Sequence, residues 1–144
     1  MGRPRGFDEE VVMRAAVGLF GRRSYDGTSV DDLVSGLGVH RGTLYNTFGS
    51  KRGVYLAALR HHVDHDVAEA ARRSAEGGPD LGLLLMAPDL GLLLMAMVER
   101  APVDPEVAAE TDRALSLLDE AGDAALVLGL LLRARATGNR SEGE

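Results

Sequence analysis

Residues 28–55 read TSVDDLVSGLGVHRGTLYNTFGSKRGVY, and this stretch decides the fold of the first half of the chain. Ser29, with Asp32 three residues later, makes a capping-box-like start and predicts a helix from the next residue onward. Gly38 suits the positive φ of a sharp turn, after which a second short helix follows. Two short helices joined by a tight glycine turn predict a helix-turn-helix motif at about residues 29–48.

The second helix of this motif carries two kinds of side chain. Val39, Leu44 and Phe48 are apolar and are predicted to face inward. Between them, from His40 to Thr47, stand hydroxyls, an amide, an aromatic ring and an Arg on the side that solvent should cover. A small domain gains no stability from such a row, so a binding partner explains it better. The shape and the chemistry suit the major groove of DNA.

Capping residues and helical periodicity predict helices on both sides of the motif. Asp8 is a reasonable N-cap for a helix over residues 9–21. Ser50 caps a long helix over residues 51–75, with apolar residues at helical spacing along it.

The C-terminal part of the chain also predicts helices. Asp104, followed by a Pro, begins one of them, and residues 124–136 form a last helix that is apolar almost all round. A single small domain does not offer enough apolar surface to bury a helix that is apolar on all sides. The polar tail 137–144 is predicted to be disordered. No segment shows the alternation of a strand, so the predicted fold class is all-α.

One nine-residue sequence, PDLGLLLMA, occurs twice in succession, at residues 79–87 and 88–96. The two copies would face opposite sides of one continuous helix, and Pro88 should break such a helix. Two short, largely buried helical pieces are therefore predicted. A recent duplication and an error in the sequence would both produce this pattern.

Charge and composition narrow the class of protein. Residues 1–60 hold nine Arg and Lys against six Asp and Glu, a net charge of +3, whereas residues 61–144 have a net charge of −9. The motif thus lies in the basic half, as a protein that meets phosphates requires. The absence of Cys excludes disulfides and thiolate metal sites. With neither a signal peptide nor a long apolar run, a cytoplasmic location and no membrane partner are predicted.

The run G-V-x-x-G-T-L-Y-x-x-F-x-S-K, from Gly38 to Lys51, resembles the DNA-binding domain of the tetracycline-repressor (TetR) family of bacterial transcription regulators. A weaker similarity links residues 91–121 to the family's central ligand-domain helices, and residues 126–136 to its last helix, which usually builds the dimer. The chain is shorter than usual members, and material is missing near Gly122. The resemblance is thus to a TetR regulator with a shortened C-terminal domain.

The resemblance implies two domains. Residues 1–60 would be a three-helix DNA-binding domain, and residues 61–144 a short helical regulatory and dimerisation domain. By resemblance the protein is a repressor that binds a palindromic double-stranded operator as a homodimer and is released by a small-molecule ligand. The alternative is a constitutive DNA-binding dimer without an inducer pocket, because the shortened half has less room for a cavity.

The resemblance also places the second helix of the motif in the major groove. Arg41 and Tyr45 are then the best candidates for base-edge contacts, since Arg pairs bidentately with guanine. Gly42 would let the backbone approach closely, and Lys51 at a helix N-terminus would bind phosphate. The complete set of predicted DNA-contacting residues is Arg3, Arg5, Ser29, His40, Arg41, Gly42, Thr43, Tyr45, Asn46, Thr47 and Lys51.

Each of these side chains also has a purely structural alternative. Thr43 could cap or bond back to its own helix, Tyr45 could pack on the helix pair, and Lys51 could be solvated surface. Arg3 and Arg5 lie in a GRPRG arm that either reaches the minor groove or is a nonspecific basic tail.

Three histidines, His61, His62 and His65, cluster on the long predicted helix. His61 and His65 are four residues apart and could hold a metal, but the sequence assigns them no third ligand of comparable quality. The prediction is therefore no metal and no cofactor, with the ligand-binding residues unknown. No nucleophile triad, phosphate-binding loop or carboxylate pair emerges either, so the protein is predicted not to be an enzyme.

Overall fold

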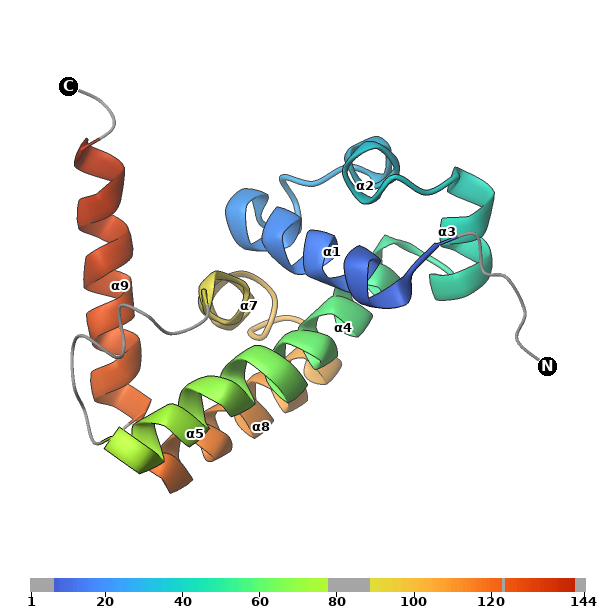
Figure 1. Cartoon of the computed structure of the whole chain (residues 1–144). Helices are drawn as coiled ribbons and strands as arrows, with labels where there is room; N and C mark the ends of the chain where they lie inside the picture. Colours follow the sequence, from blue (N-terminus) through green and yellow to red (C-terminus); the bar gives the residue numbers. More distant parts are fainter. Residues whose placement is uncertain (1–6, 78–88, 123, 142–144) are drawn as a thin grey trace.

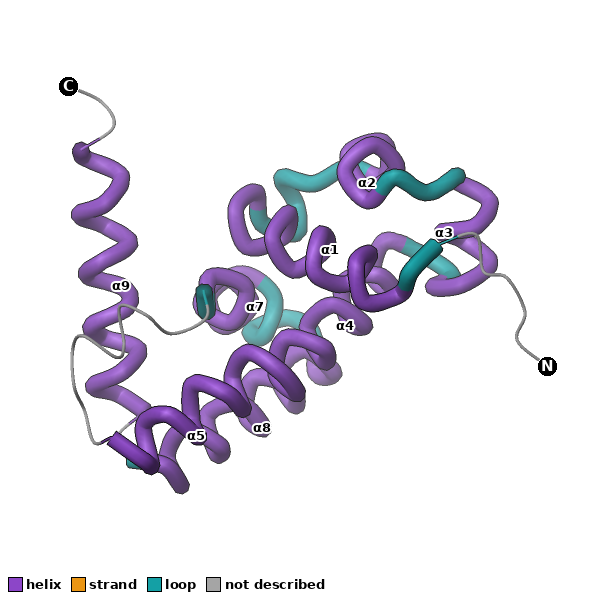
Figure 2. The backbone as a smooth tube through the Cα atoms, viewed as in Figure 1, coloured by secondary structure: helices purple, strands orange, loops and turns teal. Residues whose placement is uncertain are grey.

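The computed structural model describes residues 7–77, 89–122 and 124–141, which form helices and connecting loops (Figure 2). No strand occurs among these residues, which confirms the all-α prediction. In chain order the elements are α1 (Glu9–Arg23), α2 (Val30–Leu37), α3 (Arg41–Phe48), α4 (Lys51–His62), the π-helical turn η1 (Val63–Val67), α5 (Ala68–Gly77), α7 (Gly91–Glu99), α8 (Pro105–Ala121) and α9 (Ala124–Ser141). None of the described helices is long and apolar enough to cross a membrane.

Side-chain caps fix the beginnings of four helices, as the sequence predicts. The carboxylate of Asp8 accepts the N–H of Glu10 at 3.0 Å, and Ser29 forms a reciprocal capping box with Asp32 at the start of α2. The Ser50 hydroxyl caps α4 by accepting the N–H of Gly53 at 3.0 Å. Asp104 caps α8, whose first residue is the predicted Pro.

The elements α4, η1 and α5 follow one another as a long rod, and α8 lies along it (Figure 1). Helix α1 packs against α4 and α7, while α2 and α3 complete the N-terminal end of the molecule. Helix α9 contacts α8 and projects away from the rest of the bundle (Figure 1).

The core is continuous from α1 to α9. Its largest fully buried side chains include Phe20, Leu44, Tyr55 and Leu93, and burial of a Leu or Phe side chain contributes roughly 1.5–3 kcal/mol. The Phe20 and Tyr55 rings meet edge to face at 5.0 Å. Residues on both sides of residue 60 belong to this one core. The division into domains 1–60 and 61–144 stays a prediction.

Two helix boundaries differ from those predicted. The expected uninterrupted helix over residues 51–75 contains the η1 π turn, whose extra residue shifts the side-chain register and coincides with the burial of Asp66. Helix α9 extends to Ser141 instead of ending at residue 136. The Thr137 hydroxyl donates to the carbonyl of Arg133 at 3.1 Å, so this residue satisfies its polar group within the helix.

The second copy of the nine-residue repeat supplies the start of α7, and its leucines are buried, as predicted. The first copy, at residues 79–87, lies outside the described residues.

Candidate nucleic-acid interface

The helix pair α2–α3 is held together by a small apolar contact layer. Leu33 and Leu44 are completely buried, and Leu37 and Val39 are nearly so. Gly38 has φ 66°, a left-handed conformation that a residue with a side chain rarely adopts, and it turns the chain from α2 into α3. The residues predicted to face inward therefore fix α3 against α2 and leave its other side to solvent.

The outward side of α3 brings the predicted contact residues onto one short helix. Those that are exposed are His40, Arg41, Gly42, Tyr45, Asn46 and Thr47, whereas Thr43 is half-buried. Tyr45 keeps 42% of its surface exposed, so part of its side chain is accessible to a partner. A Cβ atom placed on Gly42 would meet no other atom within 4 Å, so the backbone of α3 is openly accessible there. A polar, aromatic and accessible helix surface of this kind can read base edges in a major groove.

Arg41, the principal candidate for a base contact, already has a partner in the structure. Its guanidinium donates to the carboxylate of Asp31 on α2. Both side chains are largely exposed, at 52% for Arg41 and 82% for Asp31. The pair orients the guanidinium in the absence of DNA, and a phosphate or a guanine would have to compete with the carboxylate for it. The sequence does not predict this pair, because Asp31 and Arg41 are ten residues apart on different helices.

Two other predicted contact residues also have structural roles. The Ser29 hydroxyl caps α2, as predicted. The Lys51 ammonium lies over the ring of Tyr25, 4.1 Å from its centre, which places it at the base of the motif instead of in open solvent. Arg3 and Arg5 lie outside the described residues.

Acidic residues of the C-terminal half brace the helix-turn-helix unit. The Glu99 carboxylate at the end of α7 accepts the backbone N–H groups of Tyr25 (2.6 Å) and Asp26 (3.0 Å) in the loop before α2. Arg52 at the start of α4 donates two hydrogen bonds to Asp104, at 2.8 and 3.0 Å. This pairing, together with hydrogen bonds from the first turn of α8, lowers the pKa of Asp104 to about 2. Neither contact is predictable from the sequence, because the partners lie more than 50 residues apart.

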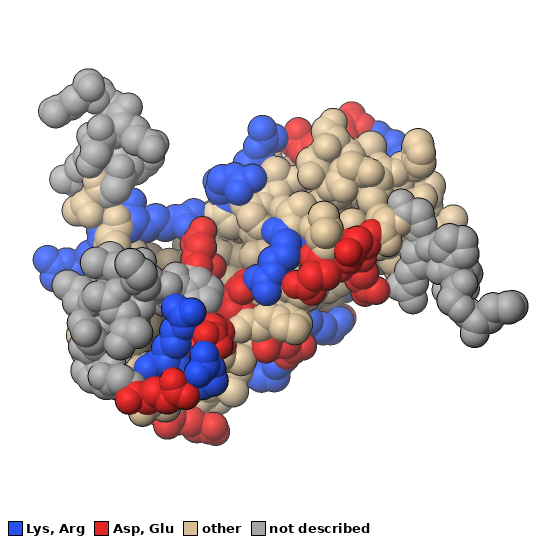
Figure 3. All heavy atoms as spheres, in the orientation of Figure 1, with Lys and Arg blue, Asp and Glu red and all other residues tan. Residues whose placement is uncertain are grey.

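Charges of both signs alternate along the long rod instead of forming one field. Figure 3 shows acidic and basic side chains side by side over α4 and α5. Several are ion pairs, among them Arg60 with Glu110 and Arg72 with Glu69. Pairing of this kind leaves little net positive potential on the rod.

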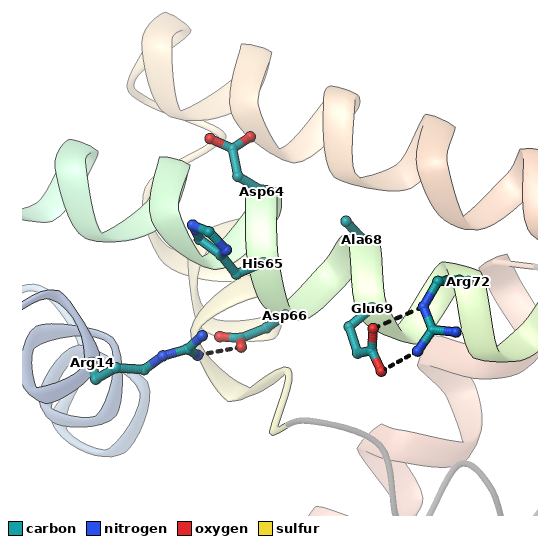
Figure 4. A pocket seen from close by; sticks show the side chains of 7 residues that line it. All are labelled: Arg14, Asp64, His65, Asp66, Ala68, Glu69 and Arg72. Atoms are coloured by element: carbon teal, nitrogen blue, oxygen red, sulfur yellow. Dashed lines mark hydrogen bonds and ion pairs between the residues drawn. The ribbon is translucent and has the colours of Figure 1, made fainter. Parts of the chain in front are cut away.

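A polar network crosses from α1 to the π turn. The Arg14 guanidinium donates to Asp66 (Figure 4). The Nδ1–H of buried His62 donates to the same carboxylate at 2.7 Å. Burial alone would raise the pKa of Asp66, but these two hydrogen bonds outweigh it and hold the pKa below its usual value. A cavity of about 520 Å³ adjoins the network, lined by Arg14, Asp64, His65, Asp66, Ala68, Glu69 and Arg72 (Figure 4).

The residues best suited to hold a metal lie beside this network. Glu10 on α1, His61 on α4 and His65 on η1 bring one ligand atom each to within 4.8 Å of one another. The sequence predicted no metal because it assigned His61 and His65 no third ligand. Glu10 is such a residue, and only the packing of α1 on α4 brings it close. Burial lowers the pKa of His61.

Comparison with known proteins identifies relatives of this arrangement. Residues 12–58 match the family of bacterial regulatory proteins of the tetR type. The chain is 31% identical to the uncharacterized HTH-type transcriptional regulator YezE of Bacillus subtilis, over 84% of this chain and 69% of that protein. It is 37% identical to the HTH-type transcriptional repressor ComR and 29% identical to the repressor BdcR, both of Escherichia coli. The matches cover 47% and 59% of this chain, but only 32% of ComR and 54% of BdcR.

A solved structure has a similar fold. The TetR family transcriptional regulator PfmR of Thermus thermophilus superposes with a TM-score of 0.50, over 90% of this chain and 80% of that one. The two sequences are 22% identical, so this similarity concerns the fold alone.

Proposed function

Because the chain belongs to the TetR family of bacterial transcriptional regulators, we propose that it represses transcription from a palindromic operator, which it binds as a homodimer and leaves when a small-molecule ligand binds. Proteins of this family are DNA-binding regulators and not enzymes. ComR and BdcR are repressors by name, which supports repression as the direction of control here. A cytoplasmic location follows from this proposal, since the operator lies on the bacterial chromosome.

The observation that carries the proposal is the accessible polar surface of α3. Arg41 and Tyr45 are exposed on it and would contact base edges, while Asn46 and Thr47 would donate to phosphate oxygens. Lys51 would add charge at the N-terminus of α4, where free backbone N–H groups also favour an anion.

The homodimer is supported by the surface of α9. This helix projects from the bundle, and Leu126 and Leu132 on it are 45% and 49% exposed. A second copy of the chain, packing α8 and α9 against its own, would bury them. The two α3 helices would then enter major grooves about 34–36 Å apart, or a multiple of one helical turn. A Leu132→Asp variant should sediment as a monomer where the wild type is a dimer.

The experiment that tests DNA recognition is a selection of binding sites from random duplex DNA with purified protein. The wild type should select an inverted repeat. Arg41→Ala should relax one base position at a cost of about 1–3 kcal/mol, while Lys51→Ala should weaken binding to all sequences and reduce the salt slope by about one. Arg72→Ala is the matched control, since it removes the same charge from α5, far from α3 (Figure 1). An Arg41→Ala protein that selects the wild-type sequence with unchanged affinity would refute the assignment.

A second candidate is a constitutive DNA-binding dimer without an inducer. Its support is that the two cavities beside Arg14, of about 520 and 300 Å³, share the charged pair of Arg14 and Asp66. Ligand sites for small organic molecules are mostly apolar. A thermal-shift screen distinguishes the two candidates. A compound that raises Tm saturably and lowers operator affinity supports ligand release, and a screen without such a compound supports the constitutive dimer.

A further inference from the structure

We propose that Glu10, His61 and His65 form a binding site for a divalent transition-metal cation of the Zn²⁺ class, joining α1 to the π turn. The three residues come from different elements, and their ligand atoms converge to within 4.8 Å of one another. Two imidazoles and one carboxylate are a known protein ligand set for zinc, with a fourth position left to water. The proposal concerns metal binding itself and does not depend on the operator or the dimer.

One of the three separations between ligand atoms already has the length that a tetrahedral cation needs. The Nε2 atom of His61 lies 3.5 Å from Oε1 of Glu10. Ligand atoms about 2.0–2.1 Å from a tetrahedral Zn²⁺ lie roughly 3.3–3.5 Å from one another. The rings of His61 and His65 are in contact, with their centres 4.3 Å apart. His65 is exposed, so its side chain can turn toward the other two without disturbing the core.

His61 provides a second, independent observation. Its Nε2 atom is buried and forms no hydrogen bond among the described residues, although Oε1 of Glu10 lies 3.5 Å away. Buried polar atoms in proteins are nearly always paired, so an unpaired one next to a carboxylate and a second imidazole calls for an explanation. A cation at this point would satisfy the lone pair that the protein itself leaves unused.

The surrounding charges are compatible with a cation. Glu10 and Asp66 together outnumber the single guanidinium of Arg14, which donates to both carboxylates. The Arg14–Glu10 pair is exposed on both sides, at 47% and 57%, and exposed pairs contribute little. A cation can therefore displace Arg14 from Glu10 while Arg14 remains bound to Asp66. Imidazole ligands favour Zn²⁺, Cu²⁺ or Ni²⁺ over Mg²⁺ and Ca²⁺, which prefer oxygen.

The test is a titration of untagged, chelator-treated protein with Zn²⁺ against a chromogenic zinc indicator, with Co²⁺ as a spectroscopic probe. The wild type should bind one cation per chain, give the intense visible bands of four-coordinate Co²⁺, and melt at a higher temperature with Zn²⁺. His65→Ala and Glu10→Gln should each weaken Zn²⁺ binding at least about 10–100-fold. Removing only the hydrogen-bond partner of a metal ligand already has an effect of this size, and these variants remove a ligand itself. Glu9→Gln and His40→Ala are matched controls that should bind like the wild type.

Two results would overturn the proposal. One is a wild-type protein that binds no stoichiometric Zn²⁺. The other is a His65→Ala or Glu10→Gln protein that binds it with unchanged affinity, since the cation would then sit elsewhere. Both variants change exposed side chains, and a melting curve of the metal-free protein verifies that they fold. Selective DNA binding by a protein without zinc affinity would leave the proposed function intact and reject only this site.

Discussion

Replacing Asp31 by Asn is expected to tighten operator binding. In the structure the Arg41 guanidinium donates to the Asp31 carboxylate. Under the proposed function Arg41 contacts a base edge, so the pair must open when the operator binds. Breaking the pair costs free energy, so the wild type binds the operator more weakly by that amount. The Asp31→Asn variant has no such ion pair to break.

The size of the effect follows from the exposure of the pair. With side chains 52% and 82% exposed, Arg41 and Asp31 form a surface ion pair, worth about 0.2–1 kcal/mol. At 1.4 kcal/mol per tenfold change, operator affinity should rise about 1.4-fold to 5-fold. Asn keeps the shape of the side chain, and the lost interaction with the N-terminus of α2 costs about 0.3–1 kcal/mol of folding stability. The variant should thus bind more tightly while melting slightly earlier.

Fluorescence anisotropy with the selected operator at fixed salt measures the change. The same substitution is made in an Arg41→Ala background, where no guanidinium remains to be released and the gain should largely vanish. Asp26→Asn is the control for charge alone, because this exposed acid lies in the loop just before α2. An equal gain with and without Arg41 would refute the reasoning, since the effect would then come only from removing a negative charge near phosphate.

Four further predictions use the same protein. Gly42→Ala should stabilise the fold by about 0.4–1 kcal/mol, because a Cβ there meets no atom, yet weaken operator binding; melting and anisotropy separate the two effects. Asp104→Asn and Asp104→Ala both lose the Arg52 ion pair, but Asn keeps the N-cap, so urea unfolding should show Ala to be worse by about 0.5–2 kcal/mol. Asp66 has a lowered pKa, because its hydrogen bonds outweigh its burial. Its contribution is present above pH 3.8, the ordinary Asp value, and is lost as the pH falls further; Asp66→Asn should flatten that acid loss in unfolding curves. Glu99→Gln should lower the free energy of unfolding by about 1–2 kcal/mol. It should also speed the hydrogen exchange of the two loop N–H groups that donate to the Glu99 carboxylate.

The features that the sequence predicts correctly depend on neighbours a few residues away. Ser29 and Asp32 form their capping box within a single turn, and Gly38 takes its left-handed φ because no side chain opposes it. The inward and outward sides of α3 follow from helical period alone, which is why Leu44 is buried and Tyr45 exposed as expected. Local geometry of this kind can be predicted from the residue types at neighbouring positions in the sequence.

The features that the sequence does not predict depend on packing between distant segments. The spacing of His61 and His65 is visible in the sequence, but Glu10 joins them only because α1 lies on α4. The π turn has no periodic signature that separates it from the surrounding helix. The partner of Arg41 was missed for a related reason, because the angle between α2 and α3 decides which acid it meets.

The contact between Glu99 and the loop before α2 indicates how the C-terminal half can act on α3. The carboxylate holds two backbone N–H groups, and a charged acceptor of this kind is worth about 1.5–3 kcal/mol per hydrogen bond. Allosteric coupling energies are commonly about 1–3 kcal/mol. A shift of α7 that opened one of these hydrogen bonds would therefore cost about 1.5–3 kcal/mol, which is enough to alter operator affinity about tenfold or more. The same loop carries Tyr25, whose ring lies under both Lys51 and Arg100, so such a shift would also disturb a proposed phosphate contact. The Glu99 carboxylate at the end of α7 is therefore one direct contact through which a movement of the C-terminal half would reach the loop before α2.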